Sequence, residues 1–138
     1  MKSTFFIIVV LFALMSFIKC EDEIKQLREK MIKYANECYK EMNITKEEGK
    51  KMRADRDFAK ERLRCYSVCF MKKSNELDEN NKFHIETISK IEHTLYPEKA
   101  DEIMKAISIC IDKVKNIEDK CDLANAYDDC VQGNVGKN

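Results

Sequence analysis

The chain has 138 residues, of which 25 are basic and 25 acidic, so its formal net charge is zero. This balance argues against nucleic acid as a partner, because duplex binding depends on a basic surface that neutralises phosphates. Only three Gly and one Pro are present, while Lys, Glu, Ile, Leu and Met are frequent, which favours helices. No segment alternates apolar and polar residues over a sustained stretch, so we expect an all-α fold without a sheet.

The first 20 residues have the organisation of a secretory signal peptide. Lys2 precedes an apolar run over residues 5–18 that only Ser16 interrupts, and Cys20 stands just before an acidic stretch. The run is shorter than the roughly 20 apolar residues that span a bilayer. We therefore predict cleavage after Cys20. Residues 1–20 are then a signal peptide, and residues 21–138 are one extracellular domain that does not insert into a membrane.

Removal of the signal peptide leaves 23 basic and 25 acidic residues, a net charge of −2, and six of the seven cysteines. An even number of cysteines in a small secreted chain indicates disulfides rather than catalytic thiols or a metal site. We expect three disulfide bonds and no bound metal.

Apolar residues that recur every three or four positions predict six helices in the mature chain. The second begins at Thr45, where Thr45 and Glu48 have the spacing of a capping box. Pro97 suits the opening turn of the fifth helix. Residues 131–138 contain two Gly and are expected to form a short loose tail. The expected helices are 22–42, a short one from 45, 55–74, 84–95, 98–115 and 119–130.

The fifth of these helices differs from the others because apolar residues cover most of its circumference. Ile103, Ile107, Ile109, Ile111 and Val114 point in several directions around the axis. A helix that is apolar nearly all round is enclosed by its neighbours, so we place this one at the centre of the fold.

Helix geometry excludes some of the 15 pairings that six cysteines allow. Cys65 and Cys69 are four residues apart, and their side chains point in parallel from one face, which does not suit a disulfide. Cys121 and Cys130 lie on opposite sides of one helix, about 13 Å apart along its axis. Ten pairings remain open. Each bridge contributes roughly 2–4 kcal/mol to stability. A domain with three of them does not need a perfectly filled interior to be stable, which leaves room for a ligand cavity.

The cysteine spacing resembles that of a known family. The six cysteines are separated by 26, 3, 40, 10 and 8 residues. This pattern resembles the six-cysteine signature of the insect odorant-binding proteins, the pheromone-binding and general odorant-binding family. The segment 65–72 is similar to the family's third helix, and 77–83 is similar to its loop into the fourth. The resemblance covers essentially the whole mature chain.

The resemblance implies six helices around an internal apolar cavity, and a secreted carrier of small hydrophobic molecules that performs no catalysis and needs no cofactor. It implies a membrane receptor as a further candidate partner, and a monomer or weak homodimer. Only eight residues follow the last cysteine, so a tail that enters the pocket is not expected here. The implied disulfides are Cys38–Cys69, Cys65–Cys121 and Cys110–Cys130.

The family pattern also suggests which residues line the pocket, although core packing uses the same residue types. Apolar burial would drive binding, and one or two polar groups would orient the ligand. Tyr66 and Ser74 are the candidate polar contacts. The candidate apolar contacts are Met71, Phe83, Ile88, Leu95, Ile107, Ile111, Tyr127 and Val131.

The remaining motifs do not predict a metal site or a catalytic site. His84 and His93 are nine residues apart on one expected helix, which favours solvated side chains over a metal pair. The acidic turn 78–81 lacks the later ligands of an EF-hand. Asn43 begins a glycosylation sequon whose Thr45 also serves as a helix cap. There is no phosphate-binding Gly loop, no zinc-protease motif and no redox Cys pair, so an enzyme is not expected.

We therefore predict a secreted carrier of odorants, pheromones or lipids. The alternative is a secreted interaction protein on the same scaffold, such as a venom, salivary or seminal component, which meets its partner through its surface. An interior without space for a ten-carbon chain would favour the alternative.

Overall fold

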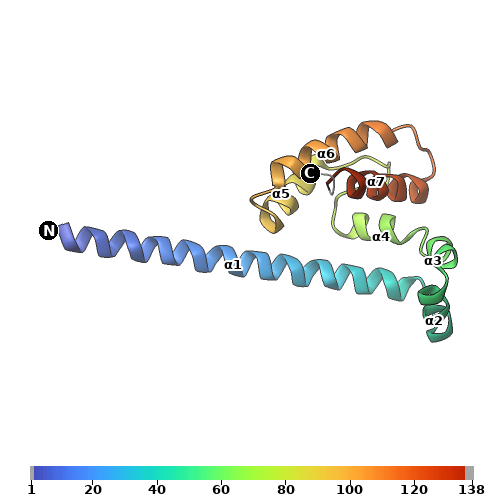
Figure 1. Ribbon diagram of the computed structural model, residues 1–138, viewed down its shortest axis with the longest axis horizontal. Coiled ribbons are helices and arrows are strands. Elements are labelled where there is room, and N and C mark those ends of the chain that lie inside the picture. The colour runs from blue at the N-terminus through green and yellow to red at the C-terminus, as the bar shows by residue number, and fades with distance from the viewer. Residues whose placement is uncertain (1, 136–138) are drawn as a thin grey trace.

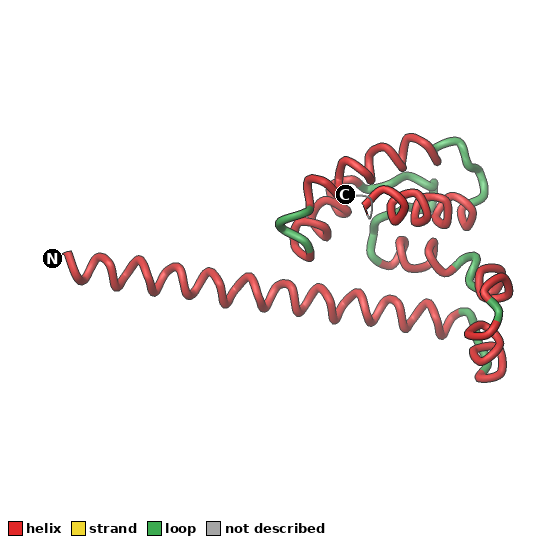
Figure 2. The backbone as a smooth tube through the Cα atoms, in the orientation of Figure 1, coloured by secondary structure: helices red, strands yellow, loops and turns green. Residues whose placement is uncertain are grey.

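The computed structural model describes the backbone of residues 2–135 and the side chains of residues 21–135. Over this part the chain is all-α, with seven helices and no strand (Figures 1 and 2). The helices are α1 (Lys2–Glu41), α2 (Lys46–Ala54), α3 (Arg56–Arg62), α4 (Tyr66–Lys73), α5 (Ile85–Leu95), α6 (Ala100–Val114) and α7 (Lys120–Val135).

Helix α1 is much longer than the expected 22–42, because its backbone is helical on both sides of the predicted cleavage site. Its N-terminal half extends away from the other helices, whereas its C-terminal half lies along α4 and α5 (Figure 1). The side chains of residues 1–20 are outside the described part, so the signal peptide stays a prediction. In the part of the chain that is described, no helix has both the length and the apolar character of a membrane span.

Helix α2 begins as its sequence predicts. The Thr45 side chain accepts a hydrogen bond from the Glu48 amide at 3.1 Å, and the Glu48 carboxylate accepts one from the Thr45 amide at 2.8 Å. These two bonds form a capping box, which satisfies amides that have no partner in the first turn. Arg62 on α3 donates to the same Glu48 carboxylate at 2.9 Å and joins the two short helices.

The expected third helix, 55–74, is two helices, so the count of six was wrong by one. The chain turns at residues 63–65, where the Arg64 amide donates to the Glu61 carbonyl and the Tyr66 amide to the Leu63 carbonyl, each three residues back. No Gly or Pro causes this break. Tertiary bonds hold the turn, because Cys65 is bonded to Cys121 and the neighbouring Arg64 forms ion pairs with the start of α7.

Helices α4 to α7 enclose the hydrophobic core, and α6 has more fully buried residues than any other helix. The expectation that this helix is enclosed on all sides was nevertheless wrong. Its apolar face packs on α5 and α7, while Ile109 on the opposite face is 52% exposed. Phe83 enters the core from the loop before α5, and its ring lies 4.8 Å from that of Tyr127, centroid to centroid.

The expected loose tail was wrong for residues 131–135, because α7 continues to Val135. Val131 and Val135 are four residues apart on one face and pack against the core. The Asn134 side chain donates to the Cys130 carbonyl at 2.7 Å, which supports the last turn. The apolar face of α7 therefore continues beyond Cys130, the last cysteine. Residues 136–138 of the expected tail lie outside the described part.

Three disulfides connect the helices, and they are the three that the family resemblance implied. Cys38–Cys69 joins α1 to α4, and Cys110–Cys130 joins α6 to α7. The third joins Cys65, before α4, to Cys121 on α7. Each bond thus connects segments that also pack together.

Candidate functional site

A groove of about 650 Å³ lies between the C-terminal half of α1 and one face of α5. Ligand pockets in proteins commonly have volumes of about 300–1,000 Å³. Its apolar lining consists of Leu27, Met31 and Tyr34 from α1 and Ile91 from α5. Polar and charged side chains complete the lining, namely Glu23, Gln26, Lys30, Ser74, Asn75, Thr87, Lys90 and Thr94.

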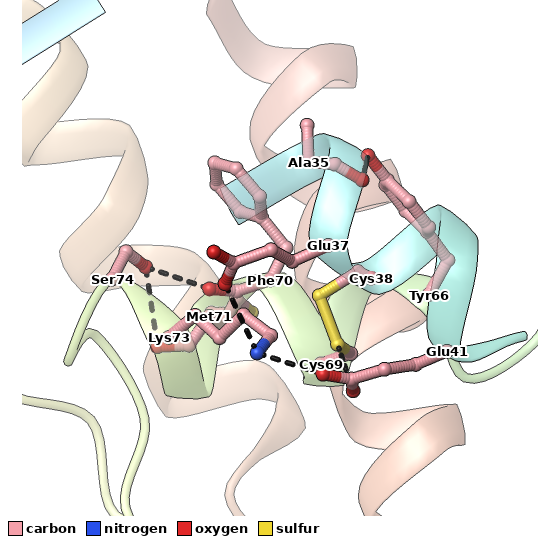
Figure 3. Close-up of a disulfide and its surroundings, with 10 residues drawn as sticks. All are labelled: Ala35, Glu37, Cys38, Glu41, Tyr66, Cys69, Phe70, Met71, Lys73 and Ser74. Carbon is pink, nitrogen blue, oxygen red and sulfur yellow. Dashed lines mark hydrogen bonds and ion pairs between the residues drawn. A yellow bond between two sulfur atoms is a disulfide. The ribbon is translucent and has the colours of Figure 1, made fainter. Parts of the chain in front are cut away.

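The α1 wall is held in place by bonds to α4 (Figure 3). Cys38 is fully buried and bonded to Cys69. One turn away, Lys73 forms ion pairs with Glu37 at 3.3 Å and with Glu41 at 2.8 Å. These contacts fix the C-terminal end of α1, from which the residues of the groove wall extend towards the N-terminus.

A second polar contact joins the same helices. The Tyr66 hydroxyl of α4 donates to the Ala35 carbonyl of α1 at 3.3 Å (Figure 3). Tyr66 was predicted to be a polar ligand contact, which stays a prediction; in this structure its hydroxyl bonds to the helix that carries the groove wall.

The α5 wall is positioned by the loop before it. Leu77 and Phe83 form an isolated antiparallel bridge, and the His84 amide donates to the Glu76 carbonyl at 2.8 Å. Ile88 on the inner face of α5 is 1% exposed and anchors the helix in the core. The outer face of α5 is therefore free to line the groove.

The same loop is closed by Asp78. Its carboxylate accepts hydrogen bonds from the amides of Lys82 and Asn80, at 3.0 and 2.8 Å, and lies 3.6 Å from His84. The bond from the Lys82 amide is the main reason that the pKa of Asp78 lies below its ordinary value. The acidic turn is thus a structural turn. In the described part of the chain, no cluster of three or more His, Cys, Asp or Glu side chains could hold a metal ion.

Ser74 marks the end of the groove where α4 stops. Its hydroxyl oxygen lies 3.0 Å from the Phe70 carbonyl, 3.2 Å from the Met71 carbonyl and 2.6 Å from a carboxyl oxygen of Glu76. Burial raises the pKa of Glu76 above its ordinary value, although the bond to Ser74 acts in the opposite direction. Ser74 therefore connects the groove to the partly buried carboxyl group of Glu76.

Eight of the ten predicted ligand contacts lie in the groove or the core, and Tyr66 and Leu95 lie in neither. Ser74 lines the groove. The apolar contacts belong to the core or pack against it, apart from Leu95, which is half-buried near the end of α5. Their role as ligand contacts stays a prediction. The core members are Met71, Phe83, Ile88, Ile107 and Tyr127, and those packed against the core are Ile111 and Val131.

The apolar groove residues were not among the predicted ligand contacts. Leu27, Met31, Tyr34 and Ile91 recur at helical spacing, which indicates only that each helix has an apolar face. Apolar periodicity does not show whether two such helix faces pack directly against each other or leave a groove between them.

The two histidines lie apart in the structure. His84 precedes α5 and is near Asp78, whereas His93 lies on α5 with its ring 3.4 Å from Asp101 of α6. Neither lines the groove between α1 and α5. Asn43, the first residue of the sequon, is exposed in the turn between α1 and α2 and has a positive φ of 49°.

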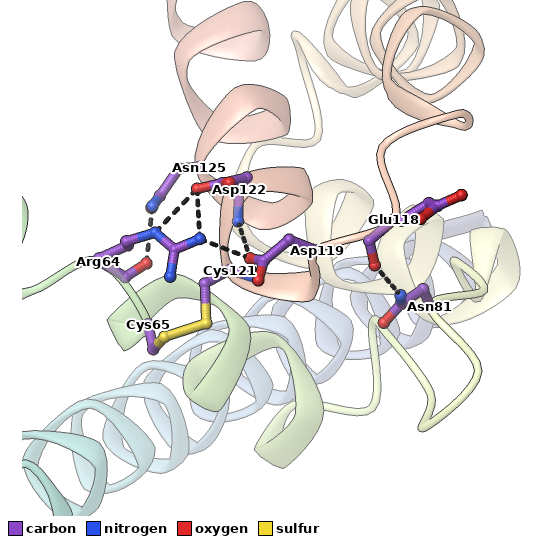
Figure 4. A network of polar contacts seen from close by, with 8 residues as sticks. All are labelled: Arg64, Cys65, Asn81, Glu118, Asp119, Cys121, Asp122 and Asn125. Atoms are coloured by element: carbon purple, nitrogen blue, oxygen red, sulfur yellow. Dashed lines mark hydrogen bonds and ion pairs between the residues drawn. A yellow bond between two sulfur atoms is a disulfide. The ribbon is translucent and has the colours of Figure 1, made fainter.

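The start of α7 is fixed by a polar network beside the Cys65–Cys121 bond (Figure 4). Arg64 lies 2.9 Å from both Asp119 and Asp122. Asp119 also accepts from the amides of Cys121 and Asp122, at 2.9 and 3.0 Å, and so caps the helix. The bond from the Asp122 amide is the main reason that the pKa of Asp119 is lowered.

Together, these features define a small all-α domain that is cross-linked by three disulfides and has a partly apolar groove between two helices. Comparison with known proteins gives the family. The model of the PBP/GOBP family matches residues 20–134, and the chain belongs to this family of odorant-binding proteins. It is a family of carriers that bind small hydrophobic ligands and are typically secreted, rather than a family of enzymes.

Two relatives illustrate the range of the similarity. The chain is 29% identical over 107 residues to general odorant-binding protein 19d of Drosophila melanogaster, a match that covers 75% of this chain and 71% of the relative. It is 28% identical over 138 residues to U-scoloptoxin(17)-Er3a of Ethmostigmus rubripes, covering 95% of this chain and 88% of the relative. No solved structure matches the chain significantly.

Proposed function

We propose that the protein is a secreted carrier that binds small hydrophobic molecules reversibly in the groove between α1 and α5. The observation that carries this proposal is the groove itself, which has a volume of about 650 Å³ and apolar side chains from both helices. Membership of the PBP/GOBP family supports it, because the proteins of that family bind small ligands.

The binding energy in such a groove comes mainly from the apolar surface that a ligand buries. At about 25 cal/mol per Å², a ligand that buries roughly 300 Å² of apolar surface gains about 7 kcal/mol before the cost of immobilisation. Met31 has an unbranched, flexible side chain that can adjust to ligands of different shape. These properties suit reversible binding of a range of apolar molecules.

Fluorescence of an apolar probe tests the proposal. We expect N-phenylnaphthylamine, which fluoresces more strongly in apolar surroundings, to bind the secreted, disulfide-bonded protein saturably. Thr94 lines the groove, and its hydroxyl donates to the Lys90 carbonyl of its own helix, at 2.8 Å. Thr94→Trp should fill the groove and weaken probe binding about tenfold or more.

Ser108→Trp is the matched control for this variant. Ser108 is exposed on α6, outside the groove, and its hydroxyl makes the same kind of bond to the Met104 carbonyl, at 3.0 Å. Probe binding should be unchanged in this variant. Absence of saturable binding to the unaltered protein would contradict the carrier proposal, and equal effects of the two Trp variants would contradict its location.

The second candidate is the interaction protein on the same scaffold. Similarity to a protein with a toxin name over 95% of this chain favours it. So does an apolar pair on the outer face of α1, where Ile32 is 60% and Tyr39 is 43% exposed. Native mass spectrometry of protein purified from its own tissue separates the two functions. A carrier retains a small molecule, whereas an interaction protein is recovered without one.

A further inference from the structure

The groove between α1 and α5 has a positively charged lysine on each wall. Lys30 comes from α1 and Lys90 from α5, and both side chains line the groove together with the apolar residues. Glu23 is the one acidic residue in the lining. The charged groups at the groove therefore have a net charge of +1.

Neither lysine is engaged in an ion pair with the described side chains of residues 21–135. The Lys30 ammonium lies 5.7 Å from the centre of the Tyr34 ring, which is also part of the groove wall. The two lysines of the neighbouring helix α4 are paired, in contrast to Lys30 and Lys90. Lys73 is paired with Glu37 and Glu41, and Lys72 is paired with Glu79.

Two ammonium groups without an ion-pair partner, one on each wall of a partly apolar groove, match one class of ligand. A neutral apolar molecule would bury its chain against Leu27, Met31 and Ile91 but would leave both charges without a partner. A molecule with an aliphatic chain and one carboxylate satisfies both parts of the site, because its head group can pair with the lysines at the groove edge.

We infer that this groove prefers free aliphatic carboxylates over neutral molecules of the same chain length. This inference rests on the proposed carrier function and adds the class of ligand. It differs from apolar binding alone in that affinity should depend on Lys30, Lys90 and ionic strength.

Competition with the fluorescent probe provides the test. Decanoate and decanol have ten carbons each, and at neutral pH only decanoate is charged. Each exposed ion pair should contribute about 1.5- to 5-fold in affinity, so decanoate should bind several-fold more tightly than decanol at low salt. Raising the ionic strength should reduce this preference, because the paired charges are exposed.

Variants that remove single charges test whether the groove lysines cause the preference for decanoate. Lys30→Gln and Lys90→Gln should each weaken decanoate binding about 1.5- to 5-fold and leave decanol binding unchanged. Glu23→Gln should strengthen decanoate binding, because it removes the negative charge from the lining. Lys25→Gln on α1 and Lys105→Gln on α6 are matched controls outside the groove, and both should bind decanoate as the unaltered protein does.

The outcomes distinguish this inference from the function on which it rests. Equal affinity for decanoate and decanol, with no effect of either groove lysine, would overturn the ligand class and leave the carrier proposal intact. Failure of the protein to bind the probe, decanoate and decanol would overturn both. Binding to phosphatidylserine vesicles, with no binding of free decanoate, would overturn the inference in favour of a membrane surface.

Discussion

Three partly buried acidic side chains lie close enough to the Tyr127 hydroxyl to interact with it electrostatically. Burial is the main cause that raises the pKa of Glu76, Glu92 and Asp128 above their ordinary values. Burial likewise raises the pKa of Tyr127, and the three carboxylates raise it further. Folding therefore favours the protonated form of each of these groups.

The raised pKa of Glu76 predicts how the stability of the protein changes with pH. Its contribution to stability is complete below its ordinary pKa of 4.5, where it is protonated in both the folded and the unfolded chain. The contribution is lost as the pH rises through the raised pKa of the folded state. We expect Glu76→Gln, which cannot ionise, to gain stability relative to the unaltered protein as the pH rises above about 4.5, measured by urea unfolding at several pH values.

Glu98→Gln is the control for this prediction, because Glu98 is exposed in the turn before α6. Its unfolding free energy should follow that of the unaltered protein at every pH. If the curves for Glu76→Gln and the unaltered protein ran parallel, the buried carboxyl would not be the source of the pH dependence.

The Thr45 hydroxyl has a structural role that can be separated from the sequon. It accepts from the Glu48 amide at 3.1 Å and begins α2. We expect Thr45→Ala to lower the free energy of unfolding by about 1 kcal/mol, and Thr45→Ser, which keeps the acceptor, to change it much less. Chemical denaturation of protein produced without glycosylation measures both values.

Asn43→Asp separates the two roles of this turn. It destroys the sequon but keeps the Thr45 cap, and Asp tolerates the positive φ of this position better than most residues. Unglycosylated Asn43→Asp should therefore be nearly as stable as the unaltered protein. A loss as large as that in Thr45→Ala would contradict the assignment of the stability to the cap.

At the scale of the helices, apolar periodicity located most elements but not their ends. The capping box of α2 was predicted from a local pattern, and the structure has it. The break at residues 63–65 has no strong local signal, because Leu63 and Arg64 are good helix formers and no Gly or Pro is nearby. It arises from bonds to α7, some 55–60 residues later in the chain, which local patterns cannot show.

At the end of α7 the sequence predicted too little helix, because two Gly near the terminus suggested a loose tail. In the structure Val131 packs on the core, and the helix continues to Val135. We expect Val131→Ala to lower the free energy of unfolding by about 1 kcal/mol, because it removes partly buried methyl groups. Gln132→Ala at the adjacent exposed position should change it by less than about 0.5 kcal/mol. Equal effects in thermal unfolding would favour the loose tail.

For the whole molecule, the cysteine spacing carried most of what could be predicted. Its family resemblance gave the three pairings, which helix geometry alone had left among ten. The groove was not predictable in the same way, because its existence depends on how far α1 stands from α5. That separation is set by the anchoring of α1 at Cys38 and of α5 at Ile88, which are distant in the chain.

The Cys38–Cys69 bond should therefore matter for binding as well as for stability. It closes a span of 31 residues, and its removal should cost about 3–4 kcal/mol in the chain-entropy model. Since it also anchors the helix that forms one wall, we expect the double variant Cys38→Ala/Cys69→Ala to lose probe binding at temperatures where its helices persist by circular dichroism.

The Cys110–Cys130 bond provides the comparison, because it spans 20 residues and has a similar expected cost of about 3 kcal/mol. It joins α6 to α7, and neither helix lines the groove between α1 and α5. Cys110→Ala/Cys130→Ala should therefore lower the melting temperature by a similar amount yet retain most of the probe affinity while folded. If both double variants lost binding equally at matched folded fractions, the ligand would lie in the shared core, among residues such as Ile107 and Tyr127, and not in the groove.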